Sequence, residues 1–325
     1  MKEINILDIE NIKIGNAQNN DALTGCTLIL CEKGAPCGVY VAGGGPASRE
    51  TNLLNPMAAA EKIHAVLLSG GSAFGLDSAG GVMEYLEEKD IGFDTGVTKV
   101  PLVCTSCIFD LGIGSKNIRP DKKTGYECAK NAYEENNYKD GNYGVGCGAT
   151  AGKLLGKDFM TKTGVGSYAV QIGNLKVGAV VCVNALGDVF DDKGNIIAGL
   201  LNSEKDGFLN TFETMIKSIE PKENLFTSNT TIGAVITNAS FDKTKMNKIA
   251  RMAHNGYVKR INPINTTADG DSIYALSTGD VISDINVVGS ISSFVVEMAI
   301  ERAIKSAKGV CGVKSYNEMQ VKKWK

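Results

Sequence analysis

The chain has 325 residues, of which 43% are hydrophobic and 22% charged, and its formal net charge is -2. This composition is ordinary for a soluble globular protein that buries a core without disulfides or metal ions. The nearly balanced charge, without a basic stripe, excludes nucleic acid as an expected partner. No uninterrupted apolar run reaches about 18 residues, so no transmembrane helix and no membrane partner are expected.

The N-terminus and the cysteines predict a cytoplasmic protein. Residues 1–6 include charged side chains and open no long apolar run, unlike a signal peptide. Nine cysteines, an odd number, are scattered from Cys26 to Cys311. In a reducing compartment such residues serve as small buried apolar side chains.

Short apolar runs bounded by glycine or charge predict buried strands in the first part of the chain, at 28–30, 39–42 and 65–68. From Leu76 to Leu86 the apolar residues recur with the helical period, and glutamates fall largely on the opposite face. Gly92 lies just past the expected end of this helix. Residues 126–133 are predicted to form a second helix.

The second half of the chain adds predicted strands at 177–184, 230–237 and 273–276, and predicted helices at 246–257 and 294–307. Residues 202–229 are polar and weakly periodic, which predicts a long exposed connection. Ser240 or Asp242 can cap the helix that follows. Because helices come in groups, the order favours α+β layers in a single domain, residues 1–325, over a doubly wound parallel sheet.

Histidine and cysteine offer little for catalysis or metal binding. The chain has only two histidines, His64 and His254, and a hydrogen-bonded structural role is the favoured interpretation of both. Cys104 and Cys107 have the spacing of a redox or zinc pair, but no second pair stands nearby to complete four ligands. Two core or loop thiols are therefore expected, and no metal site.

The glycine-rich segments match cofactor-binding motifs poorly. Residues 144–149 resemble a dinucleotide-binding loop, but a polar stretch precedes them where the motif requires a strand. Residues 70–75 lack the Gly-Lys-Ser/Thr ending of a phosphate-binding loop. Tight turns and close backbone approach explain these glycines better, and no cofactor is predicted.

A threonine can act as a nucleophile without histidine or metal. Its hydroxyl is activated by its own α-amino group once the residue becomes the first of a chain. An α-amine has a pKa of about 7.7–8.0, so a useful fraction is a free base at neutral pH. Thr230 has this setting, because it begins a predicted strand after a polar connection. A threonine at the start of a strand is common, so the position alone identifies nothing.

Residues 229–239, Asn-Thr-Thr-Ile-Gly-Ala-Val-Ile-Thr-Asn-Ala, resemble the self-cleavage segment of the DmpA-like (S58) aminopeptidases. This family includes β-peptidyl aminopeptidases, aminopeptidase/esterases that accept D-amino acids, and nylon-oligomer endohydrolases. Segments 43–51, 67–76, 108–111 and 269–271 resemble its other landmarks in the same order, so the resemblance spans nearly the whole chain. The Asn-Thr pair at the cut resembles the nylon-hydrolase branch.

The resemblance implies an αββα four-layer sandwich of the N-terminal-nucleophile type. It also implies self-cleavage between Asn229 and Thr230 into two chains, 1–229 and 230–325, that stay associated. A homo-oligomer, often a tetramer in this family, is implied as well. The implied substrate is a small peptide or another amide, and the implied chemistry needs no metal or cofactor.

Residue roles follow from the same resemblance. Thr230 would be the nucleophile, first on the preceding carbonyl and later on substrate through an acyl-enzyme. Lys153 matches the family's catalytic lysine, which could depress the pKa of the amine and stabilise developing negative charge. Asn184 matches an asparagine whose amide can donate to an oxyanion. Asp269 and Asp271 would orient the threonine amine or pair with the lysine.

These roles rest on the resemblance. Without it, an exposed lysine, a turn asparagine and an Asp-Gly-Asp turn would be the favoured interpretations. The sequence therefore predicts a self-processed N-terminal-threonine aminopeptidase or amidohydrolase. Two alternatives are an acyltransferase on the same scaffold and a non-enzymatic glycine-rich binding protein in which Thr230 never becomes a terminus.

Overall fold

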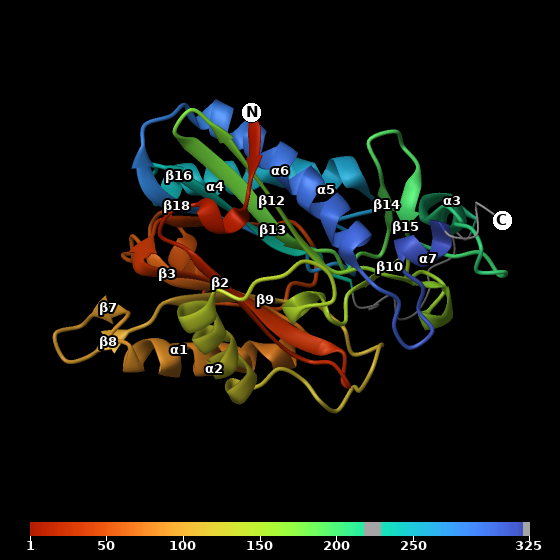
Figure 1. The fold of residues 1–325 in the computed structure, drawn as a ribbon, viewed down its shortest axis with the longest axis horizontal. Helices are drawn as coiled ribbons and strands as arrows, with labels where there is room; N and C mark the ends of the chain where they lie inside the picture. Colours follow the sequence, from red (N-terminus) through yellow and green to blue (C-terminus); the bar gives the residue numbers. More distant parts are fainter. Residues whose placement is uncertain (218–228, 321–325) are drawn as a thin grey trace.

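The computed structural model describes residues 1–217 and 229–320. Two sheets stack face to face, and helices cover the outer face of each (Figure 1). The predicted αββα order of layers is confirmed. Within the described ranges, no helix is both long and apolar enough to cross a bilayer.

The larger sheet has six strands. Its order is β1 (Lys2–Ile4), β12 (Val165–Ile172), β13 (Leu175–Cys182), β16 (Ile232–Ala239), β18 (Ser272–Val281) and β4 (Cys37–Val41). The central pair β16 and β18 is parallel, and every other neighbouring pair is antiparallel. In register, Ile232 lies opposite both Cys182 and Ser272. The end of β13 and the beginnings of β16 and β18 therefore meet at one edge of the sheet.

The second sheet has five strands. Its order is β2 (Lys13–Asn19), β3 (Thr24–Ala35), β6 (Ile63–Ser69), β9 (Val103–Cys107) and β5 (Ser48–Arg49). Here β6 and β9 run parallel, and the other pairs are antiparallel. Shorter ladders join β7 (Phe93–Asp94) to β8 (Lys99–Val100), β10 (Thr150–Ala151) to β11 (Thr161–Lys162), and β14 (Asp188–Phe190) to β15 (Ile196–Ala198) and β17 (Ile261–Asn262).

The described residues form seven α-helices. They are α1 (Ser78–Glu88), α2 (Lys122–Lys130), α3 (Thr211–Ile216), α4 (Lys243–Ala253), α5 (Asn255–Arg260), α6 (Ile285–Ser306) and α7 (Tyr316–Gln320). The pair α1 and α2 covers the five-stranded sheet, and α4, α5 and α6 cover the six-stranded sheet (Figure 1). Figure 1 shows α3, α7, β14 and β15 gathered at one end of the sandwich.

Three apolar cores hold the four layers together, one between the sheets and one beneath each helical layer. Successive residues of a strand point to opposite faces of its sheet. Val180 therefore enters the core between the sheets, and Val181 enters the core beneath α4 and α6. Because both faces of each sheet are buried, the strands read as continuous apolar runs instead of alternating ones.

Several predicted helix boundaries are wrong. The helix α2 begins at Lys122 instead of 126, and the predicted helix 246–257 is divided at His254 into α4 and α5. The helix α1 ends at Glu88, ahead of Gly92, because the chain turns at Asp90 with a left-handed φ of 57°. The helix α6 begins at Ile285, before position 294. The side chain of Asp284 caps it by accepting hydrogen bonds from the first backbone N–H groups.

Residues 202–229 contain more structure than an exposed connection. The short helix α3 lies inside them, capped by Asn210, whose side chain accepts from Glu213 N (3.0 Å). Positions 218–228 of this segment lie outside the described residues. The following helix α4 is capped by Asp242, the second of the two predicted candidates, which accepts from Lys245 N (2.8 Å).

Candidate active site

The strand ends at one edge of the six-stranded sheet bring the predicted site residues together. Thr230 lies two residues before β16, Asn184 two residues after β13, and Asp269 and Asp271 immediately before β18. All four are at most 5% exposed. Lys153 reaches the same place from the segment after β10. Residues up to 118 positions apart in the chain thus form one cluster, because 271 − 153 = 118.

Asn184 is the hub of this cluster. Its Oδ1 accepts hydrogen bonds from Lys153 Nζ (2.6 Å) and Thr150 N (3.2 Å). Its backbone oxygen accepts from Thr230 N (2.9 Å) and from Lys153 Nζ (3.2 Å). The lysine amine and the threonine nitrogen therefore share one acceptor. The Asn184 amide nitrogen donates to Phe109 O (3.1 Å), so it serves as a positioning contact here.

The Asn229–Thr230 peptide is held at its carbonyl. Thr230 Oγ1 donates a hydrogen bond to the Asn229 oxygen. The same oxygen accepts from Gly270 N (2.9 Å), and Asn229 and Asp269 are bridged in parallel register. A backbone N–H in this position polarises the carbonyl and can stabilise negative charge that develops on its oxygen.

Sequence reasoning assigned no role to Gly270. A Cβ at this residue would lie 2.9 Å from Thr230 Oγ1 and 3.0 Å from Gly45 O, which leaves no room for a side chain. The available signal was the glycine between the two aspartates. It is a common turn pattern, however, and its partners are known only from the fold.

The two aspartates hold the backbone on either side of the cluster. Asp271 Oδ1 accepts from Thr231 N (2.6 Å), next to the predicted nucleophile, and Asp271 Oδ2 accepts from Asn265 N (3.0 Å). Asp269 Oδ2 accepts from Thr266 N (2.7 Å) and Thr266 Oγ1 (2.6 Å). Both carboxylates thereby order the turn before β18, and Asp271 also holds the residue that precedes β16.

Burial shifts the pKa values of two titratable groups of the cluster toward neutral pH. It lowers the pKa of Lys153 to about 7, although the negative charges of Asp269 and Asp110 oppose this shift. Burial, and then the charge of Asp269, raise the pKa of Asp271 to about 7. A side chain with a pKa near the working pH is suited to accept and return a proton.

Asp110 is a further buried carboxyl beside the cluster, and sequence reasoning noted it only as part of a family landmark. Its two oxygens accept from Thr24 Oγ1 (2.6 Å) and Gly71 N (2.7 Å). Burial raises its pKa, while the nearby charge of Lys153 opposes the shift. The Asp110 carboxyl thus holds the glycine-rich segment 67–76 and places a negative charge near the lysine.

Two small cavities open on the cluster. One of about 210 Å³ is lined by Gly45, Ala47, Ser72, Cys107, Phe109, Asn229, Thr230, Thr267 and Ala268. The other, of about 130 Å³, is lined by Lys153 and Asp110 among others. Phe109 lines both cavities. The cavity beside Thr230 is lined by uncharged residues.

The two histidines have hydrogen-bond partners, and the Cys104–Cys107 pair is buried. Leu102 N donates to His64 Nδ1 (3.2 Å), and His254 Nε2 lies 3.0 Å from Asn265 Oδ1. Both cysteines are buried in β9, and burial raises the pKa of the Cys107 thiol. Among residues 1–217 and 229–320, no three His, Cys, Asp or Glu side chains are grouped as metal ligands.

Known proteins resemble this chain along nearly its whole length. Residues 5–317 match peptidase family S58. An uncharacterized aminopeptidase of Mycobacterium leprae is 32% identical, over 96% of this chain and 92% of its own. A 6-aminohexanoate-oligomer endohydrolase of a Kocuria species is 28% identical, over 84% of this chain and 75% of its own.

Solved structures share the fold. A Burkholderia β-aminopeptidase aligns with a TM-score of 0.68 at 16% identity, over 97% of this chain and 91% of its own. The L-aminopeptidase D-Ala-esterase/amidase of Ochrobactrum anthropi, described as a variant of the Ntn hydrolase fold, aligns with a TM-score of 0.67 at 16% identity, over 97% and 92%. The protein is therefore a hydrolase with the Ntn fold, and its chain belongs to peptidase family S58.

Proposed function

We propose that this hydrolase cuts its own chain between Asn229 and Thr230, and that Thr230 then acts as the N-terminal nucleophile of an aminopeptidase or amidohydrolase. The observation that carries the proposal is the contact of Thr230 Oγ1 with the Asn229 carbonyl, whose oxygen also accepts from Gly270 N. A nucleophile, a scissile carbonyl and an oxyanion donor thus lie side by side.

Self-cleavage begins when Thr230 Oγ attacks the Asn229 carbonyl carbon and the neutral amine of Lys153 accepts the hydroxyl proton. Gly270 N–H stabilises the tetrahedral oxyanion. The C–N bond then breaks as the nitrogen takes up a proton, which leaves an ester between Asn229 and the threonine oxygen. Water hydrolyses the ester, giving the Asn229 carboxylate and a free N-terminal Thr230.

The mature enzyme uses the same oxygen on substrate. Cleavage turns Thr230 N, which donates a hydrogen bond to Asn184 O, into a free α-amine. This amine accepts the hydroxyl proton of Thr230. Attack on an amide carbonyl of the substrate expels an amine and leaves an acyl ester on Thr230, and water releases the acid. Small peptides and peptide-like amides are the proposed substrates. The aminopeptidase and 6-aminohexanoate-oligomer relatives support this class.

The first test is the intact mass of the purified protein together with N-terminal sequencing. The proposal expects two fragments, residues 1–229 and 230–325, and a new sequence that begins Thr-Thr-Ile-Gly. A single full-length chain with hydrolase activity would contradict it.

The rate of self-cleavage is expected to depend on the protonation of Lys153. The protonated amine cannot accept the hydroxyl proton, so the rate should rise about tenfold per pH unit below the pKa and level off above it. The pKa of Lys153, lowered by burial to about 7, sets the midpoint. The measurement follows cleavage of precursor refolded from denaturant across this range.

The pKa of Asp271, raised by burial to about 7, falls in the same range, so Asp271→Asn is the control for this measurement. This variant should be slower but should keep the rise of rate with pH. A rate that no longer changes with pH in Asp271→Asn would move the proton-accepting role from the lysine to the aspartate.

The substitution Asn184→Asp separates a positioning role from an oxyanion role. It places a carboxylate at the atom that lies 2.6 Å from Lys153 Nζ, and this charge should raise the lysine pKa. The midpoint of the pH–rate curve should therefore move up by about one unit or more. A uniform loss of rate with an unchanged midpoint would instead indicate lost oxyanion stabilisation. Asn142→Asp, at a surface contact with Lys308, is the matched control.

An acyltransferase is the alternative within the same chemistry, since an amine in place of water would take the acyl group from Thr230. Product analysis with and without an added amine distinguishes the two outcomes.

We further propose a cytoplasmic homo-oligomer, with a tetramer as the expected size. Light scattering on the processed protein would measure that size.

A further inference from the structure

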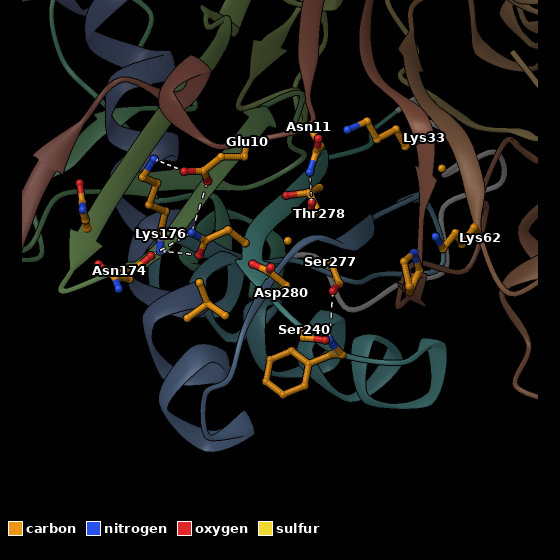
Figure 2. Close-up of a pocket in the computed structure, with 17 residues that line it drawn as sticks. Glu10, Asn11, Lys33, Lys62, Asn174, Lys176, Ser240, Ser277, Thr278 and Asp280 are labelled. Atoms are coloured by element: carbon orange, nitrogen blue, oxygen red, sulfur yellow. Dashed lines mark hydrogen bonds and ion pairs between the residues drawn. The ribbon is translucent and has the colours of Figure 1, made fainter.

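A second cleft lies at the far end of the strands that carry the candidate site. It measures about 850 Å³, and its lining includes Lys33, Lys62, Lys176, Ser240 and Asp280 (Figure 2). Strands β16 and β18 begin beside Thr230 and end at this cleft. Lys33 and Lys62 belong to the five-stranded sheet or its edge, and the other three belong to the six-stranded sheet or its edge. The cleft therefore lies between the two sheets.

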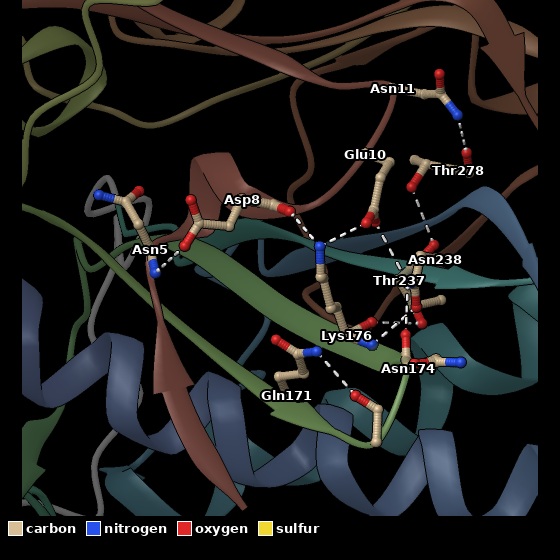
Figure 3. Close-up of polar contacts among 11 residues, drawn as sticks. Asn5, Asp8, Glu10, Asn11, Gln171, Asn174, Lys176, Thr237, Asn238 and Thr278 are labelled. Atoms are coloured by element: carbon tan, nitrogen blue, oxygen red, sulfur yellow. Dashed lines mark hydrogen bonds and ion pairs between the residues drawn. The ribbon is translucent and has the colours of Figure 1, made fainter.

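The polar groups on one wall of the cleft are hydrogen-bonded to one another. Lys176 Nζ donates to Glu10 and to Asp8 O, so its charge is already neutralised (Figure 3). Asn238 Nδ2 donates to Asn174 O (2.9 Å), and Asn238 Oδ1 accepts from Lys176 N (2.7 Å). This wall offers fixed amide and carbonyl groups and contributes no net charge.

The opposite wall carries two lysines. Lys33 and Lys62 are exposed, and their amines point into the cleft in Figure 2. Within the described part of the chain, neither makes an ion pair. Gly34 has a left-handed φ of 68°, and a Cβ there would lie 3.2 Å from Lys62 Cβ. The missing side chain at position 34 thus leaves space for the stem of Lys62.

Asp280 supplies a negative charge between the two walls (Figure 2). It also makes no ion pair with any residue that the structure describes. A purely anionic ligand would face the repulsion of this carboxylate, and a purely cationic ligand would face both lysines. A molecule with both charges at its ends meets an opposite charge at each end.

We propose that this cleft binds a small zwitterion with a carboxylate at one end and an ammonium at the other, such as an ω-amino acid or a short peptide. The carboxylate contacts Lys33 and Lys62, whose amines are compact point charges. The ammonium contacts Asp280. In a short peptide, the Ser240 hydroxyl and the Asn174 side chain would also hydrogen-bond to the amide between the two ends. Binding at this cleft is non-covalent and does not involve Thr230.

The test uses three ligands of equal chain length that contain no amide bond and so cannot be hydrolysed. These are 6-aminohexanoate, hexanoate and hexylamine, titrated calorimetrically into the full-length protein. The zwitterion should bind at least about tenfold more tightly than either singly charged analogue. This result does not depend on catalysis, so failure here leaves the proposed self-cleavage untouched, and the reverse also holds.

Variants assign the binding to this cleft. The pair Lys33→Gln and Lys62→Gln should weaken 6-aminohexanoate about tenfold or more, and Asp280→Asn should weaken it while strengthening hexanoate. Lys130→Gln, an exposed lysine on α2, and Thr230→Ala should bind as the unaltered protein does. No binding of 6-aminohexanoate at millimolar concentration, or binding unchanged in the double lysine variant, would overturn the proposal. Equal binding of hexanoate would show a plain anion site and would overturn it as well.

Discussion

Thr230→Ala is expected to yield one uncut chain of about 34 kDa without hydrolase activity. The methyl group of alanine supplies neither the oxygen that attacks Asn229 nor the oxygen that forms the acyl ester. Both steps lose their nucleophile, so the rate should fall by about a thousandfold or more. Intact mass and hydrolysis of a chromogenic amide, measured on the same preparation, check the two effects together.

Thr230→Ser is the matched control, because it keeps the hydroxyl and removes only the methyl group. This variant should still divide into two chains and retain activity. If the alanine variant divides at the same bond, Thr230 is not the nucleophile of self-cleavage. If an enzyme with a continuous backbone through this position proves active, Thr230 is not an N-terminal nucleophile.

Gly270→Ala is expected to arrest self-cleavage although it changes no reactive group. The added methyl carbon would lie 2.9 Å from Thr230 Oγ1 and 3.0 Å from Gly45 O, closer than carbon and oxygen can approach without movement. The oxyanion donor and the nucleophile must then move apart. A displacement of about 1 Å costs roughly a hundredfold in rate, so intact precursor should accumulate. Gel analysis over time after refolding measures this rate.

Gly80→Ala provides the control for adding a methyl group to glycine. Gly80 lies in α1, and a Cβ there meets nothing within 4 Å. This variant should process normally and be slightly more stable, since alanine favours a helix over glycine by up to about 1 kcal/mol. Thermal unfolding of both variants shows whether each is folded. A folded Gly270→Ala that processes at the normal rate would remove Gly270 from the proposed mechanism.

The layers were predictable because the pattern of apolar residues along a segment indicates which of its faces are buried. The continuous apolar runs at 65–68 and 177–184 follow from sheets covered on both faces. The first lies within β6, and the second lies in β13 as far as Cys182, where the strand ends two residues earlier than predicted. Of the two predicted caps before the apolar stripe, Ser240 and Asp242, the structure selects Asp242 at the start of α4. Helix boundaries near Gly92 and at position 294 were wrong, since Asp90 and Asp284 decide them through backbone conformation and capping.

The resemblance to a known family selected Thr230, Lys153, Asn184, Asp269 and Asp271, and the structure brings these residues to one edge of a sheet. Their individual contacts were beyond the sequence. The pattern Asp-Gly-Asp gave no indication that its central N–H would meet the Asn229 carbonyl. The asparagine at 184 carried no sign that its amide would hold a lysine, a strand and Phe109 at once.

By itself, the sequence determined which segments are buried, where a threonine could begin a chain, and which family the protein resembles. Only the tertiary structure decided that Gly270 N–H faces the scissile carbonyl, that burial lowers the pKa of Lys153, and that two lysines face Asp280 in a distant cleft. The physical reason is register. Apolar periodicity is a property of neighbouring residues, whereas hydrogen bonds, desolvation and charge contacts depend on which distant strand ends are brought into line.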